Sequence, residues 1–245
     1  MPETRTHQVL RSRLDYLEQH HETVDASMRV AGRRVRNTRA RSLAAALGFS
    51  NRAYPRLTHP PREMERVFSF SRAENNEMLV TQTYVVLSEY LRGILHEVYK
   101  TKPLQVVGET TPHKIEFHRI VELGGWDSLV EHMVEKVFRS LENEQDTRKL
   151  IEKVLKKAGA GLPEALDEAV QYLEMRHLFV HNGGIADEPY KKKYGVDGLR
   201  DGDHLPTDST TARTALASIR KLAREIDGEL LIVGAVQPWN AGGGA

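Results

Sequence analysis

One eleven-residue segment gathers the side chains with the clearest chemical potential. Residues 174–184 read Glu-Met-Arg-His-Leu-Phe-Val-His-Asn-Gly-Gly. Arg176 and His181 are separated by four residues, and His177 directly follows the arginine. A guanidinium is always charged and an imidazole titrates near neutral pH, so this combination suits chemistry on a phosphodiester. We therefore take Arg176, His177 and His181 as the candidate catalytic residues.

Helix geometry constrains how these three side chains cooperate. In an α-helix, Arg176 and His181 point about 140° apart, whereas His177 and His181 share a face. The pair Gly183-Gly184 predicts that the helix ends there, because glycine favours the left-handed conformation that closes helices. His181 then lies in the last turn, where the helix dipole favours its protonated form. A loosened last turn could also swing His181 toward Arg176.

The segment resembles the HEPN superfamily of all-α domains. Nuclease members of that superfamily carry an Arg, then commonly Asn, His or Asp, then three variable residues and a His. Arg176-His177-Leu-Phe-Val-His181 is similar to this pattern at each position, and Asn182-Gly183-Gly184-Ile185 resembles prokaryotic members. The resemblance covers residues 74–232 and implies a small helical bundle that begins with a long helix.

The resemblance implies a metal-independent endoribonuclease that uses no cofactor. His181 would be the acid–base residue, Arg176 would stabilise charge on the phosphate, and His177 would orient one of them. The attacking group would be the 2′-hydroxyl of the RNA, tRNA included, which leaves a 2′,3′-cyclic phosphate. Members of the superfamily typically pair two motifs across a homodimer, and some act as toxins in prokaryotic defence with an antitoxin or regulatory partner.

Other readings of the same residues stay open. Cations are favoured at a helix C-terminus without any function. Glu174, His177 and His181 form an E-x-x-H-x-x-x-H array that could hold a metal ion, although we expect Glu174 to pair with His177 or Arg176 instead. The chain could also be a HEPN-like module that binds RNA or a nucleotide without cutting it, or a helical domain that binds another protein.

The charge of the chain is unevenly distributed. Residues 1–72 hold 14 Arg, no Lys and 7 acidic residues, whereas the remainder holds 21 basic and 27 acidic residues. Residues 26–62 contain nine Arg and no acidic residue. Such a block is typical of a phosphate-binding surface, although a solvated face or pairing with the acidic bundle would also explain it. The candidate substrate-binding residues are Arg33, Arg34, Arg36, Asn182, Lys191 and Lys192, the last two in a run that we expect to form a solvated loop.

The composition is that of an ordinary globular protein, with 245 residues, 40% hydrophobic and 28% charged. No stretch approaches the roughly 20 apolar residues of a membrane span, and the N-terminus has no apolar signal-peptide core. The absence of cysteine excludes disulfides, thiolate metal sites and a cysteine nucleophile. We therefore expect a cytoplasmic protein with no membrane partner.

Apolar residues at helical spacing predict an all-α fold with little or no sheet. Residues 1–72 are expected to form an Arg-rich helical arm, residues 73–236 a HEPN-like bundle and residues 237–245 a flexible tail. Prolines predict a loop over residues 51–62, and polar residues predict another over 186–207. The expected helices are 7–22, 26–47, 72–101 ended by Pro103, 113–123, one from about 126 to 141, one around 150–155 ended by Gly159, 163–182 and 208–227.

Overall fold

A computed structural model describes residues 2–36, 39–102, 115–142, 146–195, 198–200, 202–205 and 207–239. The described residues form nine helices, and their only β pairing is an isolated bridge between Ile185 and His204. The predicted all-α class is confirmed. Within these residues, no helix combines the length and the apolar character needed to cross a membrane.

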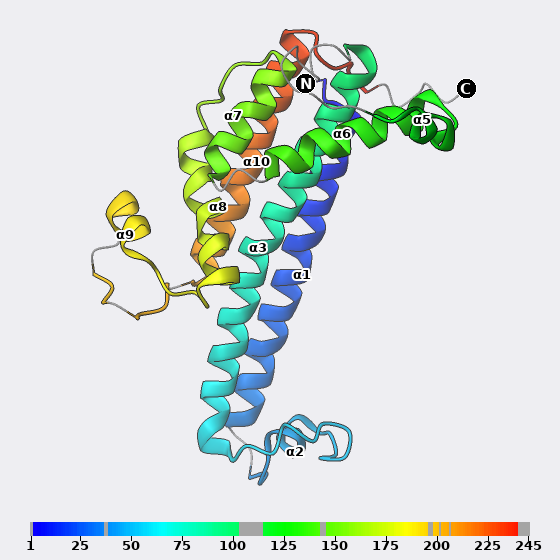
Figure 1. Ribbon diagram of the computed structural model, residues 1–245. Coiled ribbons are helices and arrows are strands. Elements are labelled where there is room, and N and C mark those ends of the chain that lie inside the picture. Colours follow the sequence, from blue (N-terminus) through cyan, green and yellow to red (C-terminus); the bar gives the residue numbers. More distant parts are fainter. Residues whose placement is uncertain are drawn as a thin grey trace.

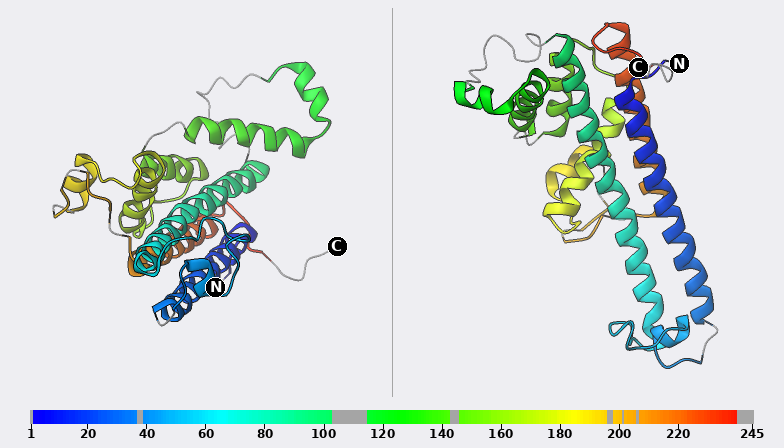
Figure 2. Two further views of the ribbon diagram at one scale, coloured as in Figure 1. Left: turned by 90° about the horizontal axis from the view of Figure 1, so that it is seen from below. Right: turned by 90° about the vertical axis from the view of Figure 1, so that its right-hand side faces the viewer.

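Two long antiparallel helices form the central hairpin of the molecule (Figure 1). Helix α1 (Arg5–Arg36) lies beside helix α3 (Pro61–Thr101), and the short helix α2 (Leu43–Leu47) lies at the far end of this hairpin. The views in Figure 2 show the same pairing along most of both helices. Helix α2 begins at Ser42, whose side chain accepts a hydrogen bond from the amide of Ala45, and it ends at Gly48 in the left-handed conformation.

The sequence prediction of two helices over 7–22 and 26–47 is wrong. Helix α1 is continuous to Arg36, because no Gly or Pro interrupts residues 22–26 and the buried face continues through them. That face carries polar groups, His21 and Asp25, in its middle section. The apolar periodicity therefore fades although the helix does not.

Helices α6 (Trp126–Glu142), α7 (Thr147–Ala158), α8 (Leu166–His181) and α10 (Ser209–Ile232) pack on the half of α3 that lies away from α2 (Figure 1). Helices α8 and α10 contact α3 and each other, and α7 packs on α3 and α8. Helix α6 crosses α3, and α5 (Phe117–Leu123) contacts α6 and buries none of its residues. Pro103, which was expected to end the long helix, and residues 113 and 114 of the helix predicted over 113–123 lie outside the described residues.

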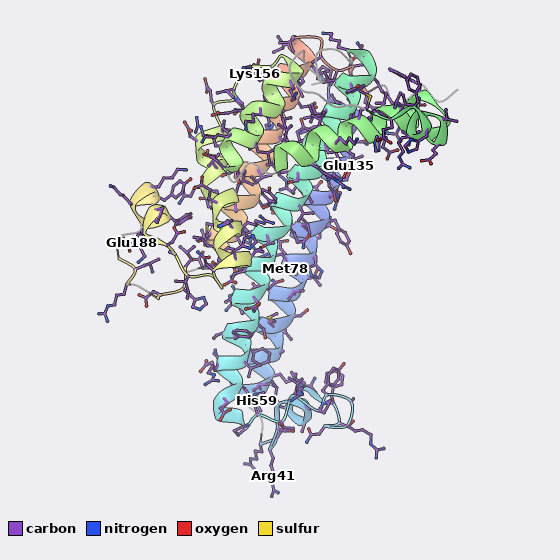
Figure 3. The ribbon with its side chains drawn as sticks, in the orientation of Figure 1. Arg41, His59, Met78, Glu135, Lys156 and Glu188 are labelled. Atoms are coloured by element: carbon purple, nitrogen blue, oxygen red, sulfur yellow. The ribbon has the colours of Figure 1, made fainter. Side chains whose placement is uncertain are left out.

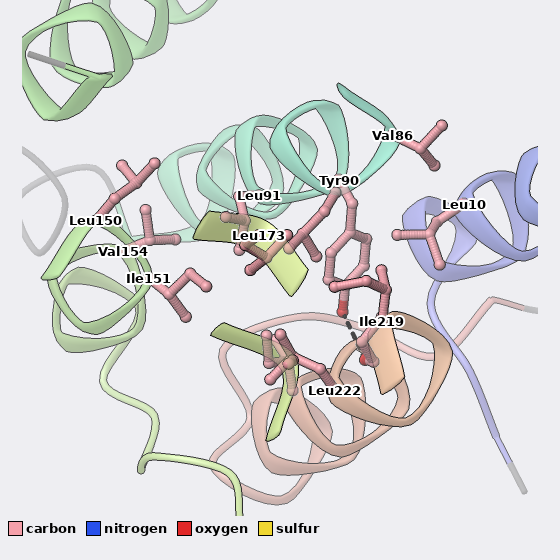
Figure 4. Close-up of a cluster of buried hydrophobic side chains, with 14 of the residues drawn as sticks. Leu10, Val86, Tyr90, Leu91, Leu150, Ile151, Val154, Leu173, Ile219 and Leu222 are labelled. Carbon is pink, nitrogen blue, oxygen red and sulfur yellow. Dashed lines mark hydrogen bonds between the residues drawn. The ribbon is translucent and has the colours of Figure 1, made fainter. Parts of the chain in front are cut away.

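One apolar core joins α1, α3, α6, α7, α8 and α10. Figure 4 shows part of it, with side chains from α1, α3, α7, α8 and α10 meeting around Tyr90. The phenol of Tyr90 donates a hydrogen bond to the carbonyl of Ala223 at 3.2 Å, so its only polar atom is satisfied in the interior. A second and smaller apolar cluster, at the α2 end of the hairpin, contains Val35, Leu43, Ala46 and Met64.

The division predicted after residue 72 falls inside the continuous helix α3. Leu10 and Leu14, in the predicted arm, belong to the main core. At the other end of the chain, the amide of Trp239 donates to the carbonyl of Glu3 at 2.8 Å, and residues 240–245 of the predicted tail lie outside the described residues.

The predicted loop over residues 186–207 contains a helix, α9 (Glu188–Tyr194). Asp187 caps it by accepting a hydrogen bond from the amide of Tyr190, and Pro189 occupies its first turn. Tyr190 and Lys191 are buried. A helix of seven residues is too short to show a clear apolar period, which explains why the sequence pattern missed it.

Candidate active site at the end of helix α8

The end of helix α8 follows the prediction made from its two glycines. Asn182 is the C-cap, and Gly183 and Gly184 have φ angles of 59° and 79°. The amides of Asn182 and Gly184 both donate to the carbonyl of Leu178, at 2.9 and 3.0 Å. His181 is therefore the last residue of a regular helix, and the loosened last turn considered from the sequence is not observed.

Arg176 lies between α8 and α3. Its guanidinium carbon is 4.4 Å from the centre of the Tyr84 ring, a cation–π contact with a side chain of α3. Its Nε is buried and has no hydrogen-bond partner among the described residues. Arg176 also lines a cavity of about 790 Å³, to which α3, α7, α8 and α9 all contribute. An anion bound in the cavity could accept a charge-assisted hydrogen bond from this buried donor.

His177 connects this cavity with His181. His177 lines the cavity beside Arg176, and its ring centre is 4.7 Å from that of His181, with 46° between the ring planes. Both imidazoles are exposed. His181 is not a lining residue of the cavity. The structure thus brings Arg176 and His177 to one cavity. His181 lies at the edge of that cavity, in contact with His177, because Arg176 and His181 point about 140° apart on the helix.

Glu174 has different partners from those expected. Its Oε1 accepts a hydrogen bond from Lys193 Nζ at 2.7 Å, and its Oε2 accepts one from the Tyr194 hydroxyl at 2.7 Å. Burial raises the pKa of Tyr194, and the contact with Glu174 raises it further, so the phenol keeps its proton. The predicted pairing of Glu174 with His177 or Arg176 is wrong, because α9 covers that face of α8 and supplies both partners.

The metal-binding alternative finds no geometric support in the part of the chain that the structure describes. No group of three or more His, Asp or Glu side chains there is arranged to hold a metal ion. Glu174, the third member of the E-x-x-H-x-x-x-H array, turns its carboxylate to α9 instead of to the histidine pair.

The lysine run does not form the predicted solvated loop. Lys191 is buried in α9, and its Nζ lies 3.0 Å from Glu188 Oε1. Lys192 is exposed, and Lys193 lines the cavity. Lys193 thus shares the cavity with Arg176, whereas the predicted substrate-binding residues Lys191 and Lys192 do not line it. Asn182 is exposed at the helix end, next to His181.

Sequence reasoning missed the residues that complete the cavity. Tyr84 comes from α3, Thr147 from the start of α7, and Tyr190 and Lys193 from α9. Burial raises the pKa of Tyr190, which remains protonated. Apart from Lys193, which ends the lysine run, none of these positions carries a sequence signal, and only the packing of α3, α7 and α9 around α8 brings them to Arg176.

A third histidine supports the loop after α8. His204 forms the isolated bridge with Ile185, and the amide of Leu205 donates to the carbonyl of Gly184 at 2.8 Å. A Cβ atom at Gly184 would lie 2.9 Å from His204 Nδ1, so the imidazole packs directly on this glycine. The close approach explains why the second position of the Gly pair has no side chain.

The candidate substrate-binding residues Arg33, Arg34 and Arg36 lie elsewhere. They occupy the last turn of α1, next to α2, whereas α8 lies along the other half of α3 and α9 lies beyond α8 (Figure 1). Within one protomer the structure does not bring them to Arg176.

The chain was compared with protein-family models, with curated proteins and with solved structures, and none of them matches it.

Proposed function

We propose that the protein is a metal-independent endoribonuclease whose site is built from Arg176, His177 and His181. The observation that carries the proposal is the position of Arg176. Its side chain lines a cavity, and its buried Nε donates no hydrogen bond to any described residue. A phosphodiester oxygen would supply the missing acceptor and would gain a charge-assisted hydrogen bond. His177 lines the same cavity, next to the phosphate that Arg176 would hold, and His181 contacts His177 but is not among the residues that line the cavity.

The chemistry requires two proton transfers. The 2′-hydroxyl attacks the adjacent phosphorus, a bond forms between O2′ and phosphorus, and the bond from phosphorus to O5′ breaks. His181 exchanges protons with the attacking and leaving oxygens, because its exposed ring can reach a strand in solvent. Arg176 stabilises the charge that develops on the phosphate, and His177 positions the His181 ring. The products are a 2′,3′-cyclic phosphate and a 5′-hydroxyl.

A homodimer would complete this site. Arg176 faces the cavity while His181 lies at the edge, so one subunit's arginine and the other subunit's histidine can act on one phosphate. Exposed apolar side chains flank the histidines, since Val180 is 49% and Ile185 is 37% exposed. A second copy of the chain would cover them. The biological setting that we propose is a cytoplasmic toxin or defence system in which an antitoxin or regulatory partner restrains the enzyme.

A second function is favoured by the shape of the cavity. Tyr84 and Tyr190 line it together with Arg176 and Lys193, and it leaves out His181. Aromatic rings and cations around a volume of about 790 Å³ suit a nucleotide or an RNA end that is bound without being cut. In that case the protein would be a binding module, and His181 would be dispensable.

The test uses labelled tRNA and single-stranded RNA in EDTA with wild-type protein and His181→Ala. We expect wild type to yield 2′,3′-cyclic phosphate ends and His181→Ala to lose a factor of roughly 10² to 10⁴ in rate. His118→Ala is the matched control, because His118 is an exposed histidine on α5. RNA that stays intact but binds wild type and His181→Ala equally would establish the binding module in place of the nuclease. Activity that is unchanged in His181→Ala would remove this residue from the mechanism.

A further inference from the structure

The far end of the α1–α3 hairpin is a separate surface, which we call the hairpin tip. It comprises the described residues between 28 and 72: the last turns of α1, helix α2, the loop after it and the first turns of α3. Figure 3 shows Arg41 pointing away from the ribbon at this end, with His59 close to the start of α3. The tip has its own small apolar cluster, so its shape is fixed by packing.

The positive charge of the tip is largely uncompensated. Arg29 and Arg72 pair with Asp25, and Arg36 pairs with Glu65 at 2.9 Å. The other arginines of the tip whose side chains are described are exposed, and no carboxylate of a described residue pairs with them. These unpaired residues are Arg33, Arg34, Arg39, Arg41, Arg52, Arg56 and Arg66. A solvated face normally mixes both signs of charge, so the tip is suited to a polyanion.

Exposed aromatic rings lie among these arginines. Phe49 is 51% and Tyr54 is 45% exposed, and their ring centres are 4.9 Å apart in the loop that carries Arg52 and Arg56. Aromatic rings and guanidinium planes are the surfaces on which unpaired bases stack, and base-paired duplexes do not offer their bases in this way. The tip therefore fits a single-stranded nucleic acid better than a duplex or an acidic protein.

A groove extends the same surface along the hairpin. It has a volume of about 520 Å³ and is lined by Arg29, Arg33, Arg36 and Arg72, with Met64 and Phe68 at its apolar part. A strand bound at the loop could continue into it, with a phosphate on Arg33 and a base against the apolar side chains, because Arg29 and Arg72 are paired with Asp25 and Arg36 is paired with Glu65.

We infer that the hairpin tip binds an unpaired loop of a folded RNA, with bases on Phe49 and Tyr54 and phosphates on the unpaired arginines. The inference rests on the proposed function for the identity of the nucleic acid. The tip is distant from the cleavage site, because residues 61 to 84 of α3 span roughly 35 Å at 1.5 Å per residue. The substrate is thus an RNA in which the loop bound at the tip and the cleaved phosphate lie about 35 Å apart.

The first experiment measures binding by fluorescence anisotropy on full-length His181→Ala protein, so that cutting does not interfere. The probes are an RNA stem–loop, its blunt duplex without the loop, and the DNA stem–loop of the same sequence. We expect Phe49→Ala or Tyr54→Ala to weaken stem–loop binding roughly fivefold to hundredfold. Phe117→Ala is the matched control, since Phe117 is 88% exposed on α5 and should have no effect. Circular dichroism verifies that each variant is folded.

The second measurement follows the salt dependence of binding. Replacing two phosphate contacts, with Arg33→Gln and Arg34→Gln together, should reduce the slope of log affinity against log salt by about 1.4. Arg5→Gln with Arg224→Gln removes the same charge from exposed positions outside the tip and should leave the slope unchanged. Equal binding of the blunt duplex and the stem–loop, or equal effects of the two double variants, would overturn the inference. Equal binding of the DNA stem–loop would overturn the assignment to RNA.

The third measurement uses wild-type protein and a series of stem–loops whose stems differ in length. If the tip holds the loop, the cut should stay at a fixed distance from the loop in every member of the series. A cut that instead keeps its distance from the open end of the stem would contradict tip anchoring. Binding that depends on Phe49 and Tyr54 without any cleavage would refute the nuclease and leave the tip as an RNA-binding surface.

Discussion

At the scale of single residues, Arg176 shows how a buried charge can be held ready for a ligand. Its cation–π contact with Tyr84 fixes the guanidinium, and its Nε remains without a partner among the described residues. Leaving a buried donor unpaired costs about 1–3 kcal/mol, so such a position is expected where binding restores the bond. The guanidinium of Arg72, by contrast, is paired with the carboxylate of Asp25.

Glu97 gives a prediction about pH at the same scale. Burial raises the pKa of Glu97, and Asp227 adds to the rise, while a hydrogen bond from Thr6 opposes it. Because the folded pKa is raised, the stability associated with this group is present below its ordinary pKa of 4.5 and is lost as the pH rises through the folded value. Glu97→Gln should therefore unfold at higher urea concentration than wild type at pH 7, and the difference should vanish below the ordinary pKa.

The control for Glu97 is Glu122→Gln, which removes an exposed carboxylate paired with Arg119 on α5. We expect this change to alter the free energy of unfolding by less than about 0.5 kcal/mol at either pH. A stabilisation by Glu97→Gln that is equally large in acid and at neutral pH would show that packing, and not the ionisation of Glu97, is responsible.

At the scale of elements, the two glycines after α8 have different surroundings. Both have positive φ angles, but a Cβ at Gly183 would meet open space, whereas one at Gly184 would lie 2.9 Å from His204 Nδ1. Gly183→Ala should cost about 1 kcal/mol through backbone strain alone. Gly184→Ala should cost more, because the loop that carries His204 is tied to Gly184 through its backbone.

Thermal unfolding of the two alanine variants measures this difference directly. For a protein of this size, each kcal/mol lowers the midpoint by about 2–4 °C. Equal midpoints would show that His204 moves aside without cost. A lower cleavage rate in Gly184→Ala at full folding would show in addition that this packing positions His181.

The helices also differ in how well their positions could be predicted from the sequence. Helices α6, α7, α8 and α10 were predicted because their apolar residues repeat at helical spacing, and the end of α8 because two glycines stop it. The continuity of α1 was missed because its buried face carries His21 and Asp25. The candidate catalytic residues lie close together in the sequence within one helix, so a sequence motif was enough to identify them. The cavity could not be predicted, since its walls come from four helices that only the tertiary packing brings together.

At the scale of the whole molecule, the proposed dimer has a clear test. If each site combines one subunit's Arg176 with the other subunit's His181, then a dimer of Arg176→Ala and His181→Ala chains contains one intact site. Random mixing makes half of the dimers mixed, so the mixture should recover about a quarter of wild-type cleavage although each variant alone is inactive. A mixture that stays inactive, beside an active wild type, would place the whole site within one chain.

The two separate apolar clusters also allow the hairpin tip and the bundle to differ in their free energy of unfolding. The cluster at the hairpin tip shares no residue with the main core, so the tip can open while the bundle remains folded. Its backbone amides should therefore exchange with solvent more readily than those of the bundle. A ligand that binds only the closed tip suppresses this opening, by about 2.7 kcal/mol at a concentration a hundredfold above its dissociation constant. The hairpin tip would then be less stable than the bundle in the free protein, and bound ligand would stabilise its folded form.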